Sequence, residues 1–425
     1  MNEAIEKLGS VISSQVDKHP KRAAAMLGTA YRAVGLHAKH FPGKQYTRSR
    51  EYLQAYTALL LADMLRDPSK SAVVNIFMPS EIFCALGMPI MAPEALATYV
   101  VNTASERVFI DKAEENGASE TFCSIHKVLT GMAEAGVIKA PAMVANTTLA
   151  CDANQLTFRR LADSWQVPHA LIDVPWRADE EAVQYVAGQL KAMGKMAEEC
   201  AGRRLSPESL RICIGRSRDQ IRNFRTYMSR RASHHLPETL TPEMLNIVAN
   251  HLYLGSEEGL TYSRLLLKDL QTAPASTGAA RIMWMHVLPN WQESIKSIFQ
   301  GADNERAEIL GCDLAFSALV DMDPEHPYES MARRLVLDSF NGPGMRRIES
   351  TYEMARKVKA DGVLIFCQWG CKQTQGLALA AKKFFEENGL PCLVLDGDSC
   401  DRANGGGEQI VTRANAFIEE LEGLS

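Results

Sequence analysis

The chain has 425 residues and a formal net charge of −5, with 46% hydrophobic and 23% charged residues. This composition is typical of a globular protein, and the length exceeds what a single core of ordinary size accommodates. The negative charge argues against a nucleic-acid partner, and no apolar run reaches the roughly 20 residues that span a membrane. The first residues, MNEAIEKLGSVISSQVDKHPKR, lack the apolar core of a signal peptide, so we expect a cytoplasmic protein.

Residues 1–70 are predicted to form a helical N-terminal segment. Apolar residues recur every three or four positions in AAAMLGTAYRAVGLHA and in SREYLQAYTALLLADMLRD. This spacing places them on one face of each helix.

Residues 71–272 are predicted to form a first α/β domain with a helical extension. Short apolar runs that end in turn residues alternate there with helical stretches, and residues 179–235 have a mostly helical pattern. Alternating strands and helices imply right-handed crossovers and a mainly parallel sheet. We predict strands within residues 71–82, 106–111, 140–152 and 169–175.

Residues 273–425 are predicted to form a second α/β domain. The small, uncharged stretch TAPASTGAA (272–280) is typical of a linker. We predict strands within 280–289, 308–316, 362–370 and 391–402, and helices at 345–359, 374–388 and 408–423. In two doubly wound domains of this kind, ligands bind outside the carboxyl ends of the strands.

Several of the ten cysteines fall at those strand ends. In FCQWGCKQTQG (366–376), Cys367 and Cys371 follow an apolar run. Cys151 and Cys400 also follow predicted strands, and Cys123 lies at a predicted helix start, where the helix dipole favours a thiolate. Each alone is better explained as a small buried residue, but as a set they are expected to converge on the cleft between the domains.

The remaining cysteines carry weaker signals. Cys84 lies on a helix after the first strand, where core packing is the simpler explanation. Core roles are also the better interpretation for Cys312 and Cys392, and Cys200 and Cys213 receive no assignment.

The spacing of the cysteines narrows the choice of metal. Structural zinc sites usually contain close C-x-x-C pairs, and simple ferredoxin clusters use a compact run of cysteines. The chain contains neither pattern. Thiolates on distant loops favour an iron–sulfur cluster held between domains, with an iron left open to substrate.

An ordered series of motifs adds a family resemblance. MPSEIFCALG, ETFCSIHKV, LACDANQLTFRRLADSWQVPHALIDVP, IMWMHVLPNW, FCQWGCKQTQG and LVLDGDSCDR follow one another from about residue 70 onward. The series resembles the 2-hydroxyacyl-CoA dehydratase and benzoyl-CoA reductase superfamily. The resemblance implies two Rossmann-like domains and a [4Fe-4S] cluster bound by three cysteines, which match Cys123, Cys151 and Cys371.

The chain departs from the dehydratase subunits in two motifs. Cys367 in CQWGC and Cys400 in DGDSCDR look more like the double-cubane-cluster proteins of the same superfamily, which are homodimeric reductases with an [8Fe-9S] cluster. Cys84 would complete that ligand set. The leading expectation is therefore a double-cubane reductase of small unsaturated molecules. The alternatives are one subunit of a heterodimeric 2-hydroxyacyl-CoA dehydratase with a ketyl-radical mechanism, and a non-catalytic scaffold or cluster-assembly partner.

The resemblance also implies a separate ATP-dependent iron–sulfur activator. The chain has no G-x-x-x-x-G-K-[ST] loop and no G-x-G-x-x-G fingerprint, since GPGMRR (342–347) fails the latter pattern. Electrons would come from the activator, and the substrate would be a small molecule or an acyl-CoA.

Three polar residues are candidates for catalysis. Glu81 is expected to open a helix and either stabilises it or contacts the substrate or cluster. His126 lies one turn after Cys123 and is either a structural histidine or a hydrogen-bond donor near the cluster. Lys372 follows Cys371 and would offset cluster charge or contact substrate.

A few other polar residues fall near the predicted cleft. Asp396 and Asp398 in LDGD are explained most simply as turn caps. His286 and Trp291 bracket a strand end and are candidates for lining the cleft.

Overall fold

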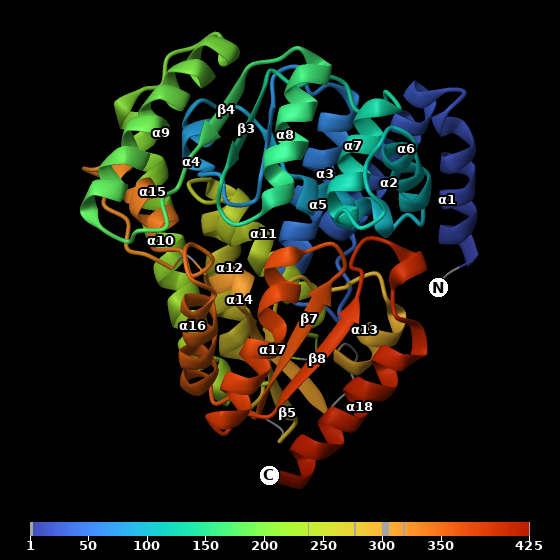
Figure 1. Ribbon diagram of the computed structural model, residues 1–425, viewed down its shortest axis with the longest axis vertical. Coiled ribbons are helices and arrows are strands. Elements are labelled where there is room, and N and C mark those ends of the chain that lie inside the picture. The colour runs from blue at the N-terminus through green and yellow to red at the C-terminus, as the bar shows by residue number, and fades with distance from the viewer. Residues whose placement is uncertain (1–2, 237, 276–277, 300–305, 318, 425) are drawn as a thin grey trace.

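The computed structural model describes residues 3–236, 238–275, 278–299, 306–317 and 319–424. It contains two four-stranded parallel sheets, one in each half of the molecule (Figure 1). The order of the first sheet is β2-β1-β3-β4 and that of the second is β6-β5-β7-β8. The predicted α/β fold with two doubly wound parallel sheets is confirmed.

The strands are β1 (Ala72–Val74), β2 (Ile90–Met91), β3 (Met143–Thr147), β4 (His169–Ile172), β5 (Ala280–Met285), β6 (Ala307–Cys312), β7 (Gly362–Gln368) and β8 (Cys392–Gly397).

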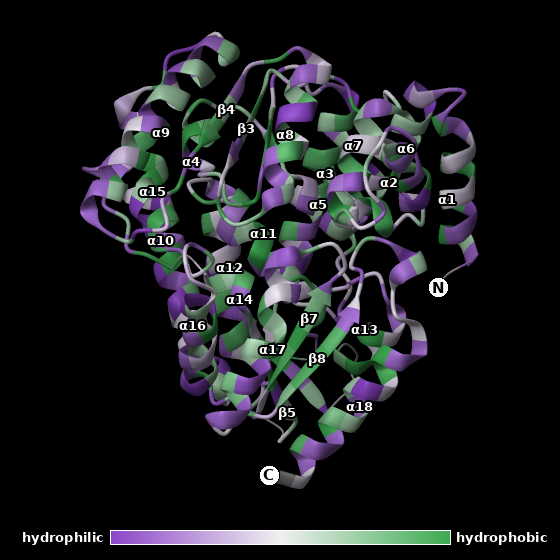
Figure 2. Ribbon diagram, viewed as in Figure 1, coloured by the Kyte–Doolittle hydropathy of each residue, from purple (hydrophilic) through white to green (hydrophobic). Residues whose placement is uncertain are grey.

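The central strands of both sheets are buried, except for the partly exposed Arg281 of β5. In the first sheet, Val73 of β1 pairs with Val144 of β3, and in the second, Leu364 of β7 pairs with Trp284 of β5. Helices cover both faces of a parallel sheet, so such strands are apolar without alternation. Figure 2 shows the apolar strands β7 and β8 beside helices with hydrophilic outer positions.

The N-terminal segment is helical, as predicted. It consists of α1 (Glu3–Val16), α2 (Pro20–His40) and α3 (Arg48–Arg66). The Thr47 hydroxyl accepts a hydrogen bond from the Arg50 N–H and caps α3. Leu27 of α2 and Leu61 of α3 belong to one apolar cluster with Val73 of the first sheet, so the segment packs onto that half of the molecule.

The remaining helices surround the sheets and connect them. Among the described residues, no helix is both long and apolar enough to cross a membrane. Their bounds are α4 (Glu81–Ala85), α5 (Pro93–Val101), α6 (Glu106–Glu115), α7 (Ser124–Glu134), α8 (Asp152–Trp165), α9 (Glu180–Ala201), α10 (Pro207–Arg230), α11 (Leu240–Leu252), α12 (Glu257–Thr272), α13 (Glu293–Phe299), α14 (Asp313–Phe316), α15 (Pro327–Val336), α16 (Gly344–Lys357), α17 (Lys372–Glu387) and α18 (Gly407–Leu424).

Two details differ from the sequence-based expectation. The predicted strand at 106–111 is wrong, because ERVFID lies in α6. The buried residues Phe109, Ile110 and Ala113 have the spacing of one face of a helix. The prediction considered only the neighbouring apolar residues Val108, Phe109 and Ile110. Strand β2 was missed, since two residues are too few to form a pattern.

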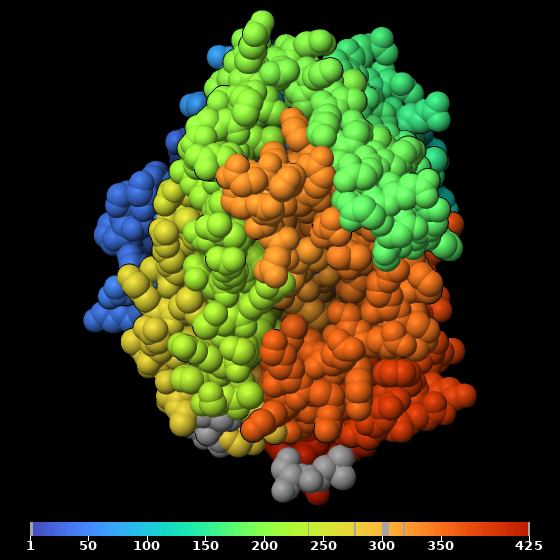
Figure 3. All heavy atoms as spheres, turned by 90° about the vertical axis from the view of Figure 1, so that its left-hand side faces the viewer, coloured from blue at the N-terminus to red at the C-terminus, as the bar shows by residue number. Residues whose placement is uncertain are grey.

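The linker predicted at 272–280 separates the strands of the two sheets in sequence. It begins at the end of α12 and reaches the start of β5, and residues 276 and 277 lie outside the described part. The chain also returns to the first half through α15, which packs against α9 and α10. Figure 3 shows this orange segment enclosed by the green helices.

A buried ion pair joins α4 in the first half to α15. The Glu81 carboxylate is fully buried and accepts two hydrogen bonds from Arg334, at 2.5 and 2.9 Å. It also accepts a hydrogen bond of 2.8 Å from the Ser217 hydroxyl of α10. The prediction that Glu81 opens a helix is confirmed, and its carboxylate is saturated by these partners.

We therefore expect Glu81→Gln to destabilise the protein by about 3–5 kcal/mol, because Arg334 would stay buried without a counter-charge. Urea unfolding followed by circular dichroism measures the loss. The double variant Glu81→Met/Arg334→Met removes both charges and should recover most of the stability. Glu180→Gln removes a partner of Arg333 from an exposed ion pair and serves as the matched control, with no measurable change expected. An equal effect of both single variants would contradict this account.

Candidate active site

Four cysteines lie at the start of a helix; one of them, Cys312 before the short α14, has no cysteine among its electrostatic neighbours, and the other three form the candidate site. Cys123 precedes α7, Cys151 follows β3 and precedes α8, and Cys371 follows β7 and precedes α17. None of the three side chains makes a capping hydrogen bond. The two sheets and α7 thus each deliver one thiol to the region between the two halves.

Four other α-helices of the described part begin with a side-chain cap. The side chains of Thr47, Asp179, Ser206 and Ser256 each accept a hydrogen bond from a backbone N–H in the first turn. Cysteine is a poor substitute for these residues as a cap. At the three cysteine positions the N–H groups and the positive end of the helix dipole remain available to stabilise a thiolate.

The three thiols are electrostatic neighbours of one another. Burial raises the pKa of Cys123 well above its usual value, and the charges of Cys151 and Cys371 add to the increase. Burial likewise raises the pKa of Cys151 to about 12, with Cys371 as the next contributor. Such a buried group of thiols stays protonated by itself, and a bound cationic metal centre is the kind of charge that would deprotonate it.

The backbone of the second half contacts Cys123 directly. Gly370 has a φ of +75°, and a Cβ atom there would lie 2.7 Å from the Cys123 backbone nitrogen and 2.8 Å from its Cα. Only glycine allows the loop before Cys371 to approach Cys123 this closely.

A buried hydrogen-bond network fixes the same junction. Ser124, the first residue of α7, donates a hydrogen bond of 2.5 Å to Asp398 after β8. Gln368 of β7 donates a hydrogen bond of 2.9 Å to the same carboxylate. Asp398 therefore links the start of α7 to two strands of the second sheet, a role that exceeds the turn cap predicted from sequence.

His126 lies within the candidate site. Its Nε2 atom is 3.7 Å from the Cys151 sulfur, and its Nδ1 atom is buried without a hydrogen-bond partner. Burial lowers the pKa of His126 to about 4, so the ring is neutral near pH 7. A neutral imidazole that donates from Nε2 would hydrogen-bond the sulfur.

Glu94, at the start of α5, was missed in the sequence. Its Oε2 atom is shielded from solvent and has no hydrogen-bond partner, and its Oε1 atom accepts a bond of 3.3 Å from the Ile76 N–H. Desolvation raises the pKa of Glu94 to about 7, and its charge acts on Cys151. The sequence shows only a Pro-Glu pair at a helix start, which is common at ordinary helices.

The structure places the other predicted site residues differently. Cys367 is buried within β7 and is an electrostatic neighbour of Cys371. Cys400 is buried in the same apolar cluster as Cys123. Lys372 is exposed in the first turn of α17. Cys84 lies instead against Cys213 of α10, and its electrostatic neighbours do not include the three helix-start thiols.

A buried arginine supports the start of α17. Arg347 forms a 2.7 Å ion pair with Asp313 and donates hydrogen bonds to Gln373 and Thr374. The same Asp313 accepts a hydrogen bond from the backbone N–H of His286. The strand end at His286 thus helps to position the loop that carries Cys371.

Within the described ranges, no group of three or more His, Cys, Asp or Glu side chains is arranged to hold a single metal ion. Ligands of an iron–sulfur cluster bind different irons, so their sulfur atoms are necessarily farther apart than ligands that share one ion.

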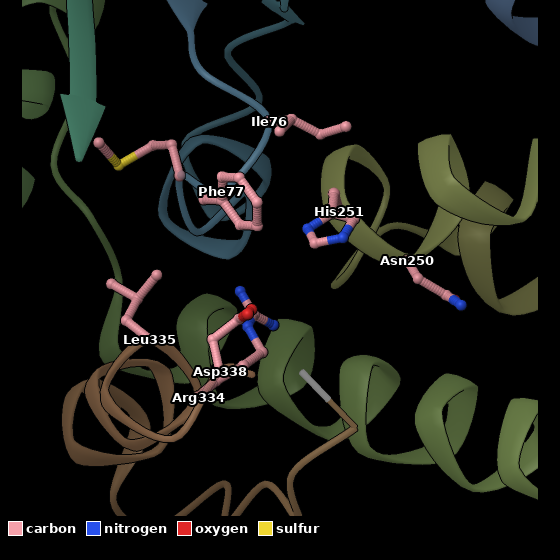
Figure 4. A pocket seen from close by; sticks show the side chains of 8 residues that line it. Ile76, Phe77, Asn250, His251, Arg334, Leu335 and Asp338 are labelled. Atoms are coloured by element: carbon pink, nitrogen blue, oxygen red, sulfur yellow. The ribbon is translucent and has the colours of Figure 1, made fainter. Parts of the chain in front are cut away.

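A second feature at the domain junction is a small cavity of about 10 Å³ near Arg334. Figure 4 shows Phe77 and His251 on one side and Arg334 and Asp338 on the other. This volume corresponds to roughly one water molecule. This cavity beside Arg334 therefore has no room for an organic substrate.

We expect Gly370→Ala to open the junction at Cys123, because the added methyl group would collide with the Cys123 backbone. Iodoacetamide should alkylate Cys123 at least several-fold faster in the variant, as measured by peptide mass spectrometry on metal-free protein. Gly389→Ala is the matched control, since Gly389 has a similar φ of +78° but nothing within 4 Å of the added Cβ. Equal alkylation rates in the two variants would contradict the proposed contact.

Glu94 predicts a specific dependence of stability on pH. The folded chain binds its proton more tightly than the unfolded chain does, so this stabilisation is complete below about pH 4.5 and is lost as pH rises through about 7. The free energy of unfolding of the wild type should therefore fall between about pH 5 and pH 7.5. In Glu94→Gln this fall should be smaller by about 2–3 kcal/mol. Urea unfolding at the two pH values tests this, and parallel pH profiles for the two proteins would disprove it.

Comparison with known proteins places the chain in a family. Residues 75–421 match the family model described as 2-hydroxyglutaryl-CoA dehydratase, D-component. The chain is 23% identical over 374 residues to the alpha subunit of (R)-2-hydroxyisocaproyl-CoA dehydratase from Clostridioides difficile, which covers 81% of this chain and 88% of that subunit. It is 21% identical over 373 residues to the alpha subunit of (R)-phenyllactyl-CoA dehydratase from Clostridium sporogenes, covering 81% and 87%.

The beta subunit of the latter enzyme is 23% identical over 254 residues, and the match spans 58% of this chain and 66% of that subunit, just under two thirds of its length. The superfamily predicted from the motif series is confirmed, because the family match extends over most of the chain. The chain thus belongs to the 2-hydroxyglutaryl-CoA dehydratase D-component family, a family of enzymes.

Proposed function

We propose that this chain is an iron–sulfur subunit of an enzyme that dehydrates 2-hydroxyacyl-CoA thioesters. Cys123, Cys151 and Cys371 would bind one [4Fe-4S] cluster. The observation that carries the proposal is the convergence of three thiols, each at the start of a different helix, between two parallel sheets. The named activities of the dehydratase relatives support the substrate class.

The residues fit such a cluster in three respects. Thiolates are the usual protein ligands of iron–sulfur clusters. The helix N-termini behind them favour the deprotonated form that metal binding requires. Three protein thiolates are fewer than the irons of the cluster, so one iron would remain open to a substrate.

When bound, the cluster would supply single electrons at low potential. The chain's own residues would control the surroundings. The contact of Gly370 with Cys123 and the buried Asp398 network would exclude water and oxygen. His126 Nε2–H would donate to the Cys151 sulfur, a kind of hydrogen bond that tunes cluster potentials.

Proton transfer in dehydration requires a group that can carry a proton near neutral pH. The shielded Glu94 carboxyl meets this condition, because its pKa is raised to about 7. We assign Glu94 Oε2 as the atom that would hold a proton for the departing hydroxyl group, beside the electrostatically coupled Cys151.

A double-cubane reductase is the second candidate. Two observations favour it: Cys367 is an electrostatic neighbour of Cys371, and the Asp398 carboxylate accepts hydrogen bonds both from the Cys400 N–H and from Ser124, the residue after Cys123. Such an enzyme would reduce small unsaturated molecules and would be a homodimer. Cys84 is left out of either ligand set, because it contacts Cys213 instead.

The proposal includes partners. The relatives named above are alpha and beta subunits, so we propose that this chain pairs with a second subunit or with a second copy of itself. A separate ATP-dependent iron–sulfur activator would provide electrons. All ten cysteines are free, which suits a reducing compartment, and we propose the cytoplasm.

Iron and sulfide counting on anaerobically purified protein tests the proposal. We expect about four irons per chain for a single cubane, and about eight for a double cubane. Cys123→Ser, Cys151→Ser and Cys371→Ser should each lose most of the iron, because a missing ligand exposes the cluster. Cys392→Ser, in which a buried strand cysteine is changed, is the control and should keep its iron.

The same experiment separates the candidates. Loss of iron in Cys367→Ser and Cys400→Ser would favour the double-cubane reductase, and full retention would favour the dehydratase. A purified protein without iron, in which the three ligand variants behave like the wild type, would disprove both and leave a non-catalytic scaffold or cluster-assembly partner.

A further inference from the structure

A second group of thiols lies away from the candidate active site. Cys84 of α4 and Cys213 of α10 are far apart in sequence, but α4 packs against α10 and the two side chains form a thiol–thiol hydrogen bond. Neither the sequence motifs nor the proposed cluster accounts for this pair.

The backbone holds the two thiols in place. Gly255, with a φ of +84°, packs against both elements, and a Cβ atom there would lie 3.0 Å from Glu81 Cγ and 3.1 Å from Cys213 Cβ. Glu81 in turn is fixed by its buried ion pair with Arg334. The two cysteines are therefore neighbours on elements that pack against each other and are held by buried contacts.

The surroundings favour one thiolate in the pair. Arg216, one helical turn after Cys213, hydrogen-bonds the Cys213 sulfur and is partly exposed. The Cys84 thiol donates a hydrogen bond to Cys213, which lowers the pKa of Cys213 and raises that of Cys84. A thiolate beside a partner thiol is the reactive form in disulfide exchange.

One member of the pair is within reach of a small reagent. Cys84 is partly exposed, whereas Cys213 is buried, as are Cys123, Cys312, Cys367 and Cys400. Access, thiolate character and a neighbouring resolving thiol are together typical of redox-active cysteines.

We propose that Cys84 and Cys213 form a redox-active dithiol that a small disulfide oxidises to an intramolecular disulfide joining α4 to α10. One thiolate attacks oxidised glutathione and releases one glutathione thiolate. The second cysteine thiol then loses its proton, attacks the mixed disulfide and releases the other glutathione. Two cysteine thiols lose two electrons and two protons, and one glutathione disulfide becomes two glutathione thiols. The proposal requires no cluster and is independent of the proposed function.

The test uses the full chain, purified without oxygen and equilibrated with mixtures of reduced and oxidised glutathione. Free thiols are trapped with iodoacetamide, disulfides are then reduced and labelled with N-ethylmaleimide, and peptides are measured by mass spectrometry. We expect Cys84 and Cys213 to oxidise together and to yield a linked peptide in unreduced samples. Cys200, a partly exposed cysteine on α9, is the internal control and should show no such linkage.

The dependence on glutathione concentration distinguishes the two kinds of product. For an internal disulfide, a tenfold dilution of both glutathione species at a constant ratio raises the oxidised-to-reduced ratio about tenfold, whereas a mixed disulfide shows no change. Cys213→Ser should leave Cys84, the partly exposed thiol, with the second behaviour. Circular dichroism checks that this variant is folded. If it is unfolded, the dilution experiment on the wild-type protein still tests the proposal.

Two results would overturn the proposal. One is wild-type protein in which Cys84 and Cys213 stay alkylable by iodoacetamide at excess oxidised glutathione. The other is oxidation that gives only mixed disulfides with glutathione, without the linked peptide and without the dilution effect.

Discussion

The candidate site depends on one constraint, the direction of parallel strands. In a parallel sheet every strand ends at the same edge, so the loops and helices that follow are collected there. Cys151 follows β3 of the first sheet and Cys371 follows β7 of the second. Because the loop before Cys371 packs on the backbone of Cys123, these edges meet, and residues from distant parts of the chain come together.

Bringing thiols into such a buried junction is electrostatically costly for their ionised forms. The same burial that raises the pKa of Cys123 and Cys151 also raises that of Glu94 and lowers that of His126. Near pH 7 in the protein alone, the two thiols and the His126 ring are neutral, whereas the Glu94 carboxyl is about half protonated. A cluster that neutralises the thiolates would therefore change the charge balance of the whole site, while the neighbouring carboxyl and imidazole remain free to exchange protons.

The amino-acid sequence alone predicted much of this arrangement. The apolar runs before Cys371 and before Asp398 predicted strands, and they form β7, which is buried, and β8, which is partly exposed at the edge of the sheet. Cys123 and Cys151 were expected at helix starts and strand ends, where they lie.

The sequence does not show how the two halves of the molecule lie relative to each other. The contact of Gly370 with Cys123, the link from Ser124 to Asp398 and the pairing of Cys84 with Cys213 all join segments that no local pattern relates. The strand expected at 106–111 was wrong for a similar reason. A few apolar residues in a short segment fit the spacing of a helix as well as that of a strand, and contacts with the rest of the chain decide between the two.

The most direct test of the central claim is an anaerobic crystal structure with anomalous diffraction measured on both sides of the iron absorption edge. The account predicts one compact iron signal in contact with the sulfur atoms of Cys123, Cys151 and Cys371, between the ends of the two sheets. Iron bound elsewhere in the protein, or these three sulfur atoms far from any metal in a fully loaded sample, would contradict it.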